Sequence, residues 1–223
     1  MKRGKNYNSA VEKRGEEKMT ADEVVAFVKE NASAKFDESI EVHIRLNIDP
    51  KKGEQSVRGS VTLPHGTGKE VRIGVITEDK ADEAKKAGAD LIGGQELIDK
   101  IKKGELPDVD VLVATPDMMP KLAPAARVLG PRGLMPSPKT DTVTPNVADA
   151  IDSLKKGKAN FKNDNTGNIH QVIGKVSFTQ EQIVENYNAF MDAVKACKSD
   201  AHKGKLIATK SMCSTMGPAV KIK

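Results

Sequence analysis

The chain has 223 residues, which is enough for one large domain or two small ones. Its hydrophobic content of 38% and charged content of 30% are typical of a globular protein, and the net charge of +5 makes a polyanion a candidate partner. No segment approaches the ~20 consecutive apolar residues of a membrane helix, and the basic N-terminus lacks the apolar region of a secretory signal.

The two cysteines, Cys197 and Cys213, stand far apart and fit neither a disulfide framework nor a zinc-ligand cluster. They are typical of free thiols in a reducing compartment. Together with the missing signal, they predict a cytoplasmic protein.

The first predicted elements are a helix and two strands. Thr20-Ala21-Asp22-Glu23 matches a capping box, in which the Thr hydroxyl and the Glu carboxylate each bond a free amide of the first turn. Apolar residues at helical spacing then extend to Asn31. Residues 40–48 alternate strictly between apolar and polar, which predicts a half-buried antiparallel strand. A turn at residues 51–54 and a strand at 56–63 complete a predicted hairpin.

The middle of the chain has a different pattern. Residues 71–77 and 109–114 are continuous apolar runs of strand length, and Gly88 is placed to end a helix. Pro120 and Pro124 interrupt a helical stretch over residues 117–129. Helices are expected at residues 80–87 and 95–103, and a short strand at 89–92. Fully buried strands that alternate with short helices indicate a small parallel α/β unit.

The two-faced pattern returns near the C-terminus, where alternation over residues 172–178, a helix at 180–198 and a strand at 206–212 are expected. The two ends of the chain therefore share an α+β style that differs from the middle. We predict an outer domain formed by residues 1–66 and 158–223 around an inserted α/β domain of residues 67–157. Two domains in sequence along the chain are the alternative.

The charge distribution favours the insertion. Residues 67–157 carry 14 Lys+Arg and 15 Asp+Glu, a balance of −1, so 36 − 14 = 22 and 31 − 15 = 16 remain for the two ends, a balance of +6. From Lys195 onward there are seven lysines and a single acidic residue, Asp200. The outer domain is therefore the one expected to hold a polyanion.

Catalytic motifs are not evident. The four histidines have no metal-ligand spacing, so neither a metal nor a cofactor is expected. The segment His65-Gly66-Thr67-Gly68-Lys69 resembles a phosphate loop, but the positions of its first Gly and of its hydroxyl residue are Leu63 and Glu70. An enzyme that uses nucleotides or phosphosugars on the inner domain is the rival interpretation, and it would need such a loop.

Three loop segments and one histidine have features of RNA contacts. Lys35 and Phe36 lie in a polar loop, where the ring could stack on a base, although a Phe packed in the core is the alternative. His170 opens a strand and could equally be structural. Residues 211–218 are rich in small and hydroxyl side chains, as suits contact with a ribose-phosphate chain, or they form an ordinary turn. The Pro- and Gly-rich loop at residues 129–139 displays Arg132 and Lys139. It could contact RNA, or it could merely cover the sheet.

Several longer motifs occur in a fixed order along the chain: Lys2-Arg3-Gly4-Lys5, Met118-Met119-Pro120, Gly130–Pro136, Asn163-Asp164 through Gly167, Ile169-His170, Gly174-Lys175 and Ser214–Pro218. In these motifs the sequence resembles the L-one family of bacterial large-subunit ribosomal proteins, over essentially its whole length. Asn6 and Asn8 depart from the pattern, because relatives often carry more Arg or Lys in the leader.

The resemblance implies a split β-α-β outer domain, similar to ferredoxin or RNA-recognition folds, around a Rossmann-like three-layer α/β domain. It implies a non-enzymatic constituent of the large ribosomal subunit that binds the 23S rRNA at the base of the mobile stalk, near the tRNA exit site, and assists release of deacylated tRNA. It also implies repression of translation through the mRNA leader of its own operon, and a monomer when the protein is free.

By position in the family pattern, one set of residues is expected to contact RNA and a second set to make additional contacts. The expected contacts are Lys35, Phe36, His170, Lys175, Ser211, Thr215, Met216 and Gly217, with Arg132 and Lys139 as the additional ones. A general basic RNA chaperone is a third interpretation, which predicts little discrimination between this RNA junction and any duplex.

Overall fold

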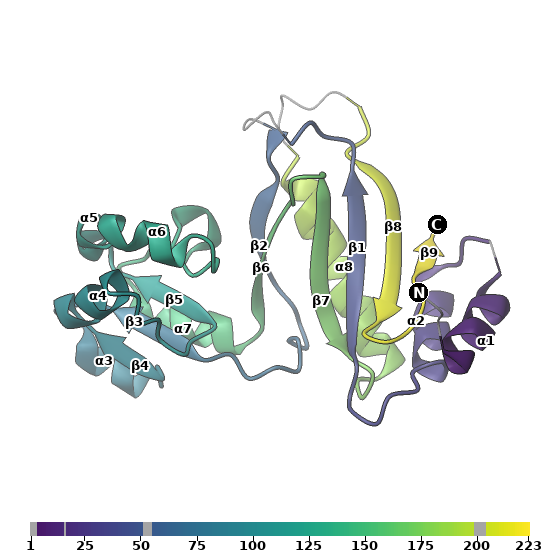
Figure 1. Cartoon of the computed structure of the whole chain (residues 1–223), viewed down its shortest axis with the longest axis horizontal. Helices are drawn as coiled ribbons and strands as arrows, with labels where there is room; N and C mark the ends of the chain where they lie inside the picture. Colours follow the sequence, from purple (N-terminus) through teal and green to yellow (C-terminus); the bar gives the residue numbers. More distant parts are fainter. Residues whose placement is uncertain (1–3, 16, 51–54, 199–203) are drawn as a thin grey trace. The chain divides into compact units, whose positions relative to one another are not determined.

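The computed structural model describes residues 4–15, 17–50, 55–198 and 204–223 (Figure 1). It contains two compact units. The outer unit comprises Met1–Gly68 and Ala159–Lys223, and the inner unit comprises Lys69–Lys158. Both are mixed α/β: the outer unit has a four-stranded antiparallel sheet and a two-stranded sheet, and the inner unit a three-stranded parallel sheet.

The elements of the outer unit are α1 (Lys5–Arg14), α2 (Ala21–Glu30), β1 (Ser39–Leu46), β2 (Arg58–Thr62), β6 (Lys158–Lys162), β7 (Asn168–Lys175), α8 (Gln180–Ala196), β8 (Ile207–Ser214) and β9 (Val220–Ile222). The larger sheet has the order β7-β1-β8-β9, so its central strands come from opposite ends of the chain. β2 pairs with β6 in the smaller sheet.

Local sequence signals explain the two main helices of the outer unit. Thr20 and Glu23 form the predicted capping box at the start of α2. Thr179 and Gln182 form a second one at the start of α8. Since each box satisfies free amides of the first turn, both helices begin where the sequence places them.

β1 shows the predicted alternation. Ile40, Val42, Ile44 and Leu46 are buried on one face, where they join a core that includes apolar residues of α2 and α8. The opposite face carries polar side chains and is partly or fully exposed. One face of the sheet is therefore covered by helices, and the other is open.

The predicted hairpin is wrong. β1 pairs with β7 on one side and with β8 on the other, so it has no free edge for β2. β2 pairs instead with β6, the strand that begins where the chain returns from the inner unit. The turn predicted at residues 51–54 lies outside the described residues.

The charged leader contains an element that its composition did not predict. Residues 5–14 form α1, whose Ala10 is buried, and Arg14 Nη1 donates a hydrogen bond to the carbonyl of Ala219 at 2.7 Å. Because this contact joins residues 205 positions apart, no local pattern signals it.

The inner unit contains β3 (Ile73–Ile76), α3 (Ala81–Lys86), β4 (Leu91–Gly93), α4 (Gln95–Lys102), β5 (Val111–Ala114), α5 (Met119–Leu122), α6 (Ala126–Leu129) and α7 (Val147–Lys155), with 3₁₀ turns η2 (Pro116–Met118), η3 (Ala123–Ala125) and η4 (Pro138–Thr140). β3 pairs in parallel with β4 and with β5, as the buried apolar runs predict.

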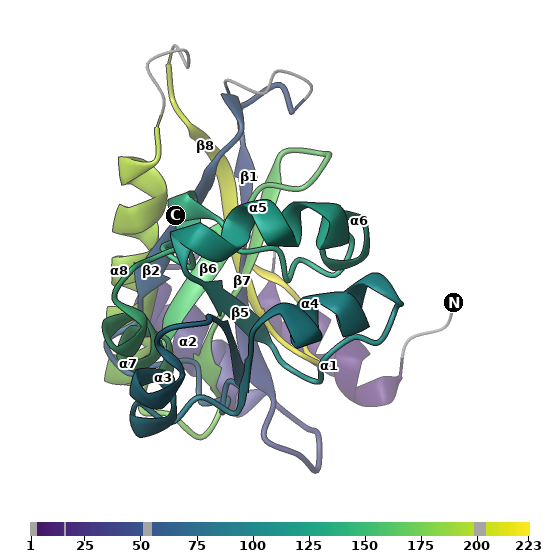
Figure 2. The ribbon, with the colours of Figure 1, turned by 90° about the vertical axis from the view of Figure 1, so that its left-hand side faces the viewer.

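Two apolar clusters fill the inner unit, and each draws residues from different helices. One joins Ile98 and Ile101 of α4 to Leu122 and Leu129 of the next helical segment, and the other includes residues of α3 and α7. The predicted interruption of the helix over residues 117–129 is present: Figure 2, in which this unit faces the viewer, shows α5 and α6 as one broken run. Gly88 ends α3 with a φ of 79°, as its position predicts.

Candidate RNA interface

Two loops of the outer unit meet at one end of the four-stranded sheet. The first precedes β1 and carries Lys35 and Phe36, and the second follows β8. In the sheet register, Ser39 lies opposite Lys175 of β7, and Ile40 lies opposite Ser214 of β8. The register therefore brings together the predicted RNA contacts of three separate sequence segments.

Glu38 joins the two loops. Its side chain is only 1% exposed, and its carboxylate accepts hydrogen bonds from the amide of Ala34 at 2.9 Å and from the amide of Met216 at 3.0 Å. Burial by itself would raise the pKa of this carboxyl, but the hydrogen bonds outweigh that effect and hold the pKa below the ordinary value of 4.5. A buried, ionised carboxylate thus fixes both loops.

Sequence reasoning did not single out Glu38. The residue lies within the loop that contains Phe36, but an acidic side chain next to a proposed RNA contact gives no positive signal for phosphate binding. Its partner Met216 lies 178 residues away, so only the folded chain identifies its role.

Further hydrogen bonds position the same loops. The Thr215 hydroxyl accepts from the amide of Ser39 at 3.1 Å, and the Thr215 amide donates to the Ser39 carbonyl at 3.0 Å. On the other side, Asp37 accepts from the amide and hydroxyl of Ser177, and the Lys175 ammonium lies 3.9 Å from the Asp37 carboxylate. The Thr215 hydroxyl also donates to the Ser39 carbonyl at 3.3 Å, so the protein uses it both as a donor and as an acceptor.

Two large apolar side chains project from these loops. Phe36 is 57% exposed and Met216 is 61% exposed, and they are the large hydrophobic residues recorded as exposed in the described part of the chain. The alternative in which Phe36 packs in the core is wrong. Exposed apolar side chains fixed on a rigid frame are suited to stacking on unpaired bases.

Gly217 allows the second loop to turn tightly. A Cβ atom placed on this residue would lie 2.6 Å from Oγ of Ser214, so that one of the two atoms would have to shift. A larger residue at position 217 would therefore require the Ser214 hydroxyl to rotate away, whereas glycine leaves it in place.

His170 and Ser211 lie further along the open face of the sheet. Both are opposite His43 of β1, which is three residues from Ile40, or about 10 Å along the strand. The residues predicted to bind RNA thus form two groups. The end group lies at the end of the sheet around Phe36, and the row group consists of His170 and Ser211, which lie opposite His43 on the open face.

The row group is linked by side-chain contacts. Nδ1 of His43 lies 2.7 Å from Nδ1 of His170, and Nε2 of His43 lies 3.2 Å from Sγ of Cys213. Burial and the neighbouring His170 lower the pKa of His43, so its imidazole is neutral at pH 7. Burial and the nearby Glu41 raise the pKa of the Cys213 thiol, which keeps it protonated and unreactive.

The Asn163-to-Gly167 motif forms the turn that leads into β7. The Asp164 carboxylate accepts hydrogen bonds from the amides of Asn168 and Thr166, both at 2.7–2.8 Å, and from the Thr166 hydroxyl. The hydrogen bond from Asn168 is the largest cause that lowers the pKa of Asp164 far below its ordinary value. The motif therefore positions β7, which carries His170.

The loop at residues 130–136 belongs to the inner unit. Arg132 is exposed there, whereas Leu134 and Met135 are half-buried against the cluster that contains Leu129. Arg132 therefore belongs to a different unit from the group around Phe36. The side chain of Lys139 lies outside the described part of the chain.

Metal-binding clusters and membrane-spanning helices are both absent from the described residues. Among the described residues, no group of three or more His, Cys, Asp or Glu side chains could hold a metal ion. Within the same part of the chain, no helix has both the length and the apolar composition needed to cross a membrane.

Comparison with known proteins gives a consistent result. Residues 28–218 match the model of the ribosomal protein L1p/L10e family. Three relatives are each named large ribosomal subunit protein uL1. The one from Cutibacterium acnes is 50% identical over 100% of this chain and 96% of its own length. The one from Mesoplasma florum is 47% identical over 99% of this chain and 96% of its own length, and the one from Streptomyces virginiae is 50% identical over 99% of this chain and 92% of its own length. This family is one of structural, non-enzymatic ribosomal proteins. The chain therefore belongs to the ribosomal protein L1p/L10e family.

Proposed function

We propose that this protein is a structural constituent of the large ribosomal subunit and binds the 23S rRNA at the base of the mobile stalk, near the tRNA exit site. It acts in the cytoplasm, on the ribosome, and is a monomer when free. The observation that carries the RNA-binding proposal is the convergence of two exposed apolar side chains, Phe36 and Met216, on loops that a single buried carboxylate joins.

The proposed mode of recognition is a preformed surface. Phe36 and Met216 stack on or cover unpaired bases, and the backbone around Gly217 lies close to the ribose-phosphate chain. Lys35 and Lys175 neutralise phosphates at the same end of the sheet, and Ser211 and His170 extend the surface along its open face. Since the loops are already fixed by Glu38, binding requires little ordering of the protein.

The domain arrangement is part of the proposal. The outer unit is a split β-α-β domain formed by both ends of the chain, and the inner unit is a Rossmann-like three-layer α/β domain inserted between residues 66 and 158. Support comes from the antiparallel β7-β1-β8-β9 sheet and from the parallel β4-β3-β5 sheet, which lies between two apolar clusters. The inner domain assists release of deacylated tRNA, a role that rests on the family resemblance.

We extend the proposal to regulation. The same surface binds a similar fold in the mRNA leader of the protein's own operon and represses translation, as the family resemblance implies. A transcript of that leader and the ribosomal RNA fragment would then compete for one site, and their binding would be mutually exclusive.

The test is filter binding of the purified protein to the stalk-base fragment of the 23S rRNA at moderate salt. A scrambled hairpin of equal length is the competitor. Preference for the stalk fragment by orders of magnitude supports recognition of a specific site. Equal competition supports a general RNA chaperone and contradicts the proposal, because a purely electrostatic interaction does not distinguish the two RNAs.

A further inference from the structure

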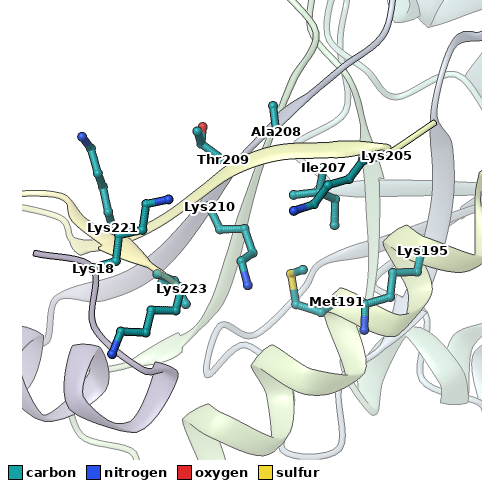
Figure 3. Close-up of a pocket in the computed structure, with 11 residues that line it drawn as sticks. Lys18, Met191, Lys195, Lys205, Ile207, Ala208, Thr209, Lys210, Lys221 and Lys223 are labelled. Atoms are coloured by element: carbon teal, nitrogen blue, oxygen red, sulfur yellow. The ribbon is translucent and has the colours of Figure 1, made fainter.

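A second concentration of positive charge lies at the β8–β9 edge of the outer sheet. Here a groove of about 250 Å³ runs between α8, β8 and β9 (Figure 3). Six lysines line it together with small and apolar residues. They are Lys18, Lys195, Lys205, Lys210, Lys221 and Lys223.

The sheet register places the centre of this groove apart from the loops around Phe36 and Thr215. Lys210 lies opposite Ile44 of β1 and Ile222 of β9, two residues whose side chains are buried on the helix-covered face. Thr215, in the proposed interface, lies five residues further on, about 17 Å along the strand. Lys210 and Ile222 therefore lie on the helix-covered face, whereas Lys221 pairs with Ser211 and lies on the open face at the margin of the groove.

The floor of the groove is apolar and its rim is cationic. Met191 of α8 and Ile222 of β9 are each 5% exposed and form part of the lining. Figure 3 shows the Lys210 side chain leaving β8 toward the space beside α8, and the Lys195 side chain extending from that helix. The long methylene stems of the lysines can lie on this floor while the ammonium groups remain in water.

The lysines are not neutralised by acidic residues that line the groove, because none of the described lining residues is Asp or Glu. Two carboxylates lie at its margin: Asp192, 2.9 Å from the Lys195 ammonium, and Glu23, whose charge interacts with Lys223. Burial lowers the pKa of Lys210, and the charges of Lys195, Lys205 and Lys18 lower it further. The cations therefore repel one another in the free protein.

We propose that this groove binds the phosphate groups of an RNA strand, as a second RNA-binding site separate from the loops around Phe36. A row of phosphates satisfies several spaced ammonium groups at once, and its binding relieves their mutual repulsion. The hollow has room for a phosphate with its water, because one water occupies about 30 Å³. The outer unit has the same sign, because 36 − 15 = 21 Lys+Arg and 31 − 15 = 16 Asp+Glu lie in it, a balance of +5.

The test uses a decauridylate labelled with fluorescein, an unstructured RNA without the stalk junction. For a single strand, log K falls by about 0.7 per neutralised phosphate for each tenfold rise in salt. The variant Lys195→Gln/Lys210→Gln is therefore expected to reduce the salt slope by about 1.4, and to weaken binding about 25-fold near 0.1 M salt.

The matched control is Lys13→Gln/Lys162→Gln, which removes the same charge from exposed positions of the outer unit outside the groove. It should weaken binding less than about threefold, because long-range charge effects are screened at this salt. Equal weakening by the two variants would mean that only net charge matters, and would overturn the proposal. If Lys210 proves necessary for folding, Lys195→Gln/Lys205→Gln takes its place.

The NMR signal of the Met191 methyl group tests whether the RNA lies in the groove. With ¹³C-methyl methionine labelling, the Met191 signal is identified by Met191→Leu, and Met118, buried in the inner unit, serves as the internal reference. Decauridylate should shift Met191 and leave Met118 unchanged. Lack of a Met191 shift at saturation would overturn the assignment.

A parallel titration with pyrophosphate distinguishes the source of the phosphate. If pyrophosphate displaces decauridylate at equal concentration, the groove is a site for compact anions and the proposal of an RNA strand fails. In the Phe36→Ala variant, decauridylate should still shift the Met191 signal, because that signal reports occupation of the groove and not of the loops around Phe36. Loss of stalk-fragment recognition and loss of groove binding are thus separate outcomes.

Discussion

The two units carry similar numbers of charged residues but use them differently. In the inner unit, cations pair with nearby carboxylates: Lys69 lies 2.6 Å from Asp110, and Lys121 lies 2.7 Å from Glu78. In the outer unit, lysines gather along one groove whose described lining contains no acid. Exposed ion pairs add little stability, but they neutralise charge locally. Composition alone thus indicates an excess of positive charge, whereas the pairing of charges decides where a polyanion can bind.

The largest expected effect follows from removal of the carboxylate that joins the two loops. Glu38→Ala leaves the amides of Ala34 and Met216 without their acceptor, at a cost of about 2–4 kcal/mol in the free energy of unfolding. Affinity for the stalk fragment should fall as well. Urea unfolding and filter binding of the same preparation measure both effects.

The pH dependence of stability gives the matching check. Because the folded-state pKa of Glu38 lies below 4.5, its contribution is present above that value and is lost as the pH falls through the lower, folded-state value. Subtracting the acid unfolding profile of Glu38→Gln from that of the wild type should isolate this loss. Identical profiles would mean that Glu38 does not fix the loops.

The next effect separates binding from stability within the outer unit. Phe36→Ala should weaken stalk-fragment binding about ten- to a hundredfold, the cost of one lost stack, while thermal unfolding stays nearly unchanged. Phe161, buried against Phe190, is the matched control. Phe161→Ala should lower stability by about 3–5 kcal/mol. A stability loss of that size in Phe36→Ala would contradict the exposed placement of the ring.

A smaller effect concerns His43 and His170 of the row group. Burial and His170 lower the pKa of His43, so the unfolded chain binds more protons below the ordinary value of 6.5, and stability should fall as the pH drops below that value. Between about pH 7.5 and about pH 5.5 the expected loss is less than about 1 kcal/mol. Denaturation at both pH values measures it, and His43→Gln should reduce it. His170→Gln tests the contribution of the neighbouring ring.

The smallest expected effect comes from the inner unit. Replacement of residues 69–157 by a short Gly-rich link should leave a folded outer unit that binds the stalk fragment within about threefold of the full chain, because the proposed contacts and the basic excess lie outside the deleted part. Circular dichroism and filter binding check this outcome. Arg132→Gln in the full chain should also change affinity less than threefold. An unfolded or non-binding product would contradict the independence of the two units.

The sequence predicted much of the local structure of this protein. Capping residues placed the start of α2, and the alternation in β1 identified the face that is buried, because a strand presents successive side chains to opposite faces. Pro120 and Pro124 correctly predicted a broken helix. The charge balance of each part and the family resemblance were also readable from the chain itself.

Tertiary structure decided which residues meet. β1 pairs with β7 and β8 rather than with the next strand in sequence, and this register brings Lys175 and Thr215 to the loop of Phe36. The role of Glu38 and the gathering of lysines beside Met191 follow from the same pairing. Backbone geometry repeats every two or 3.6 residues and so leaves a local pattern. Contacts between residues up to 205 positions apart depend on how whole elements pack, which leaves no local pattern in the sequence.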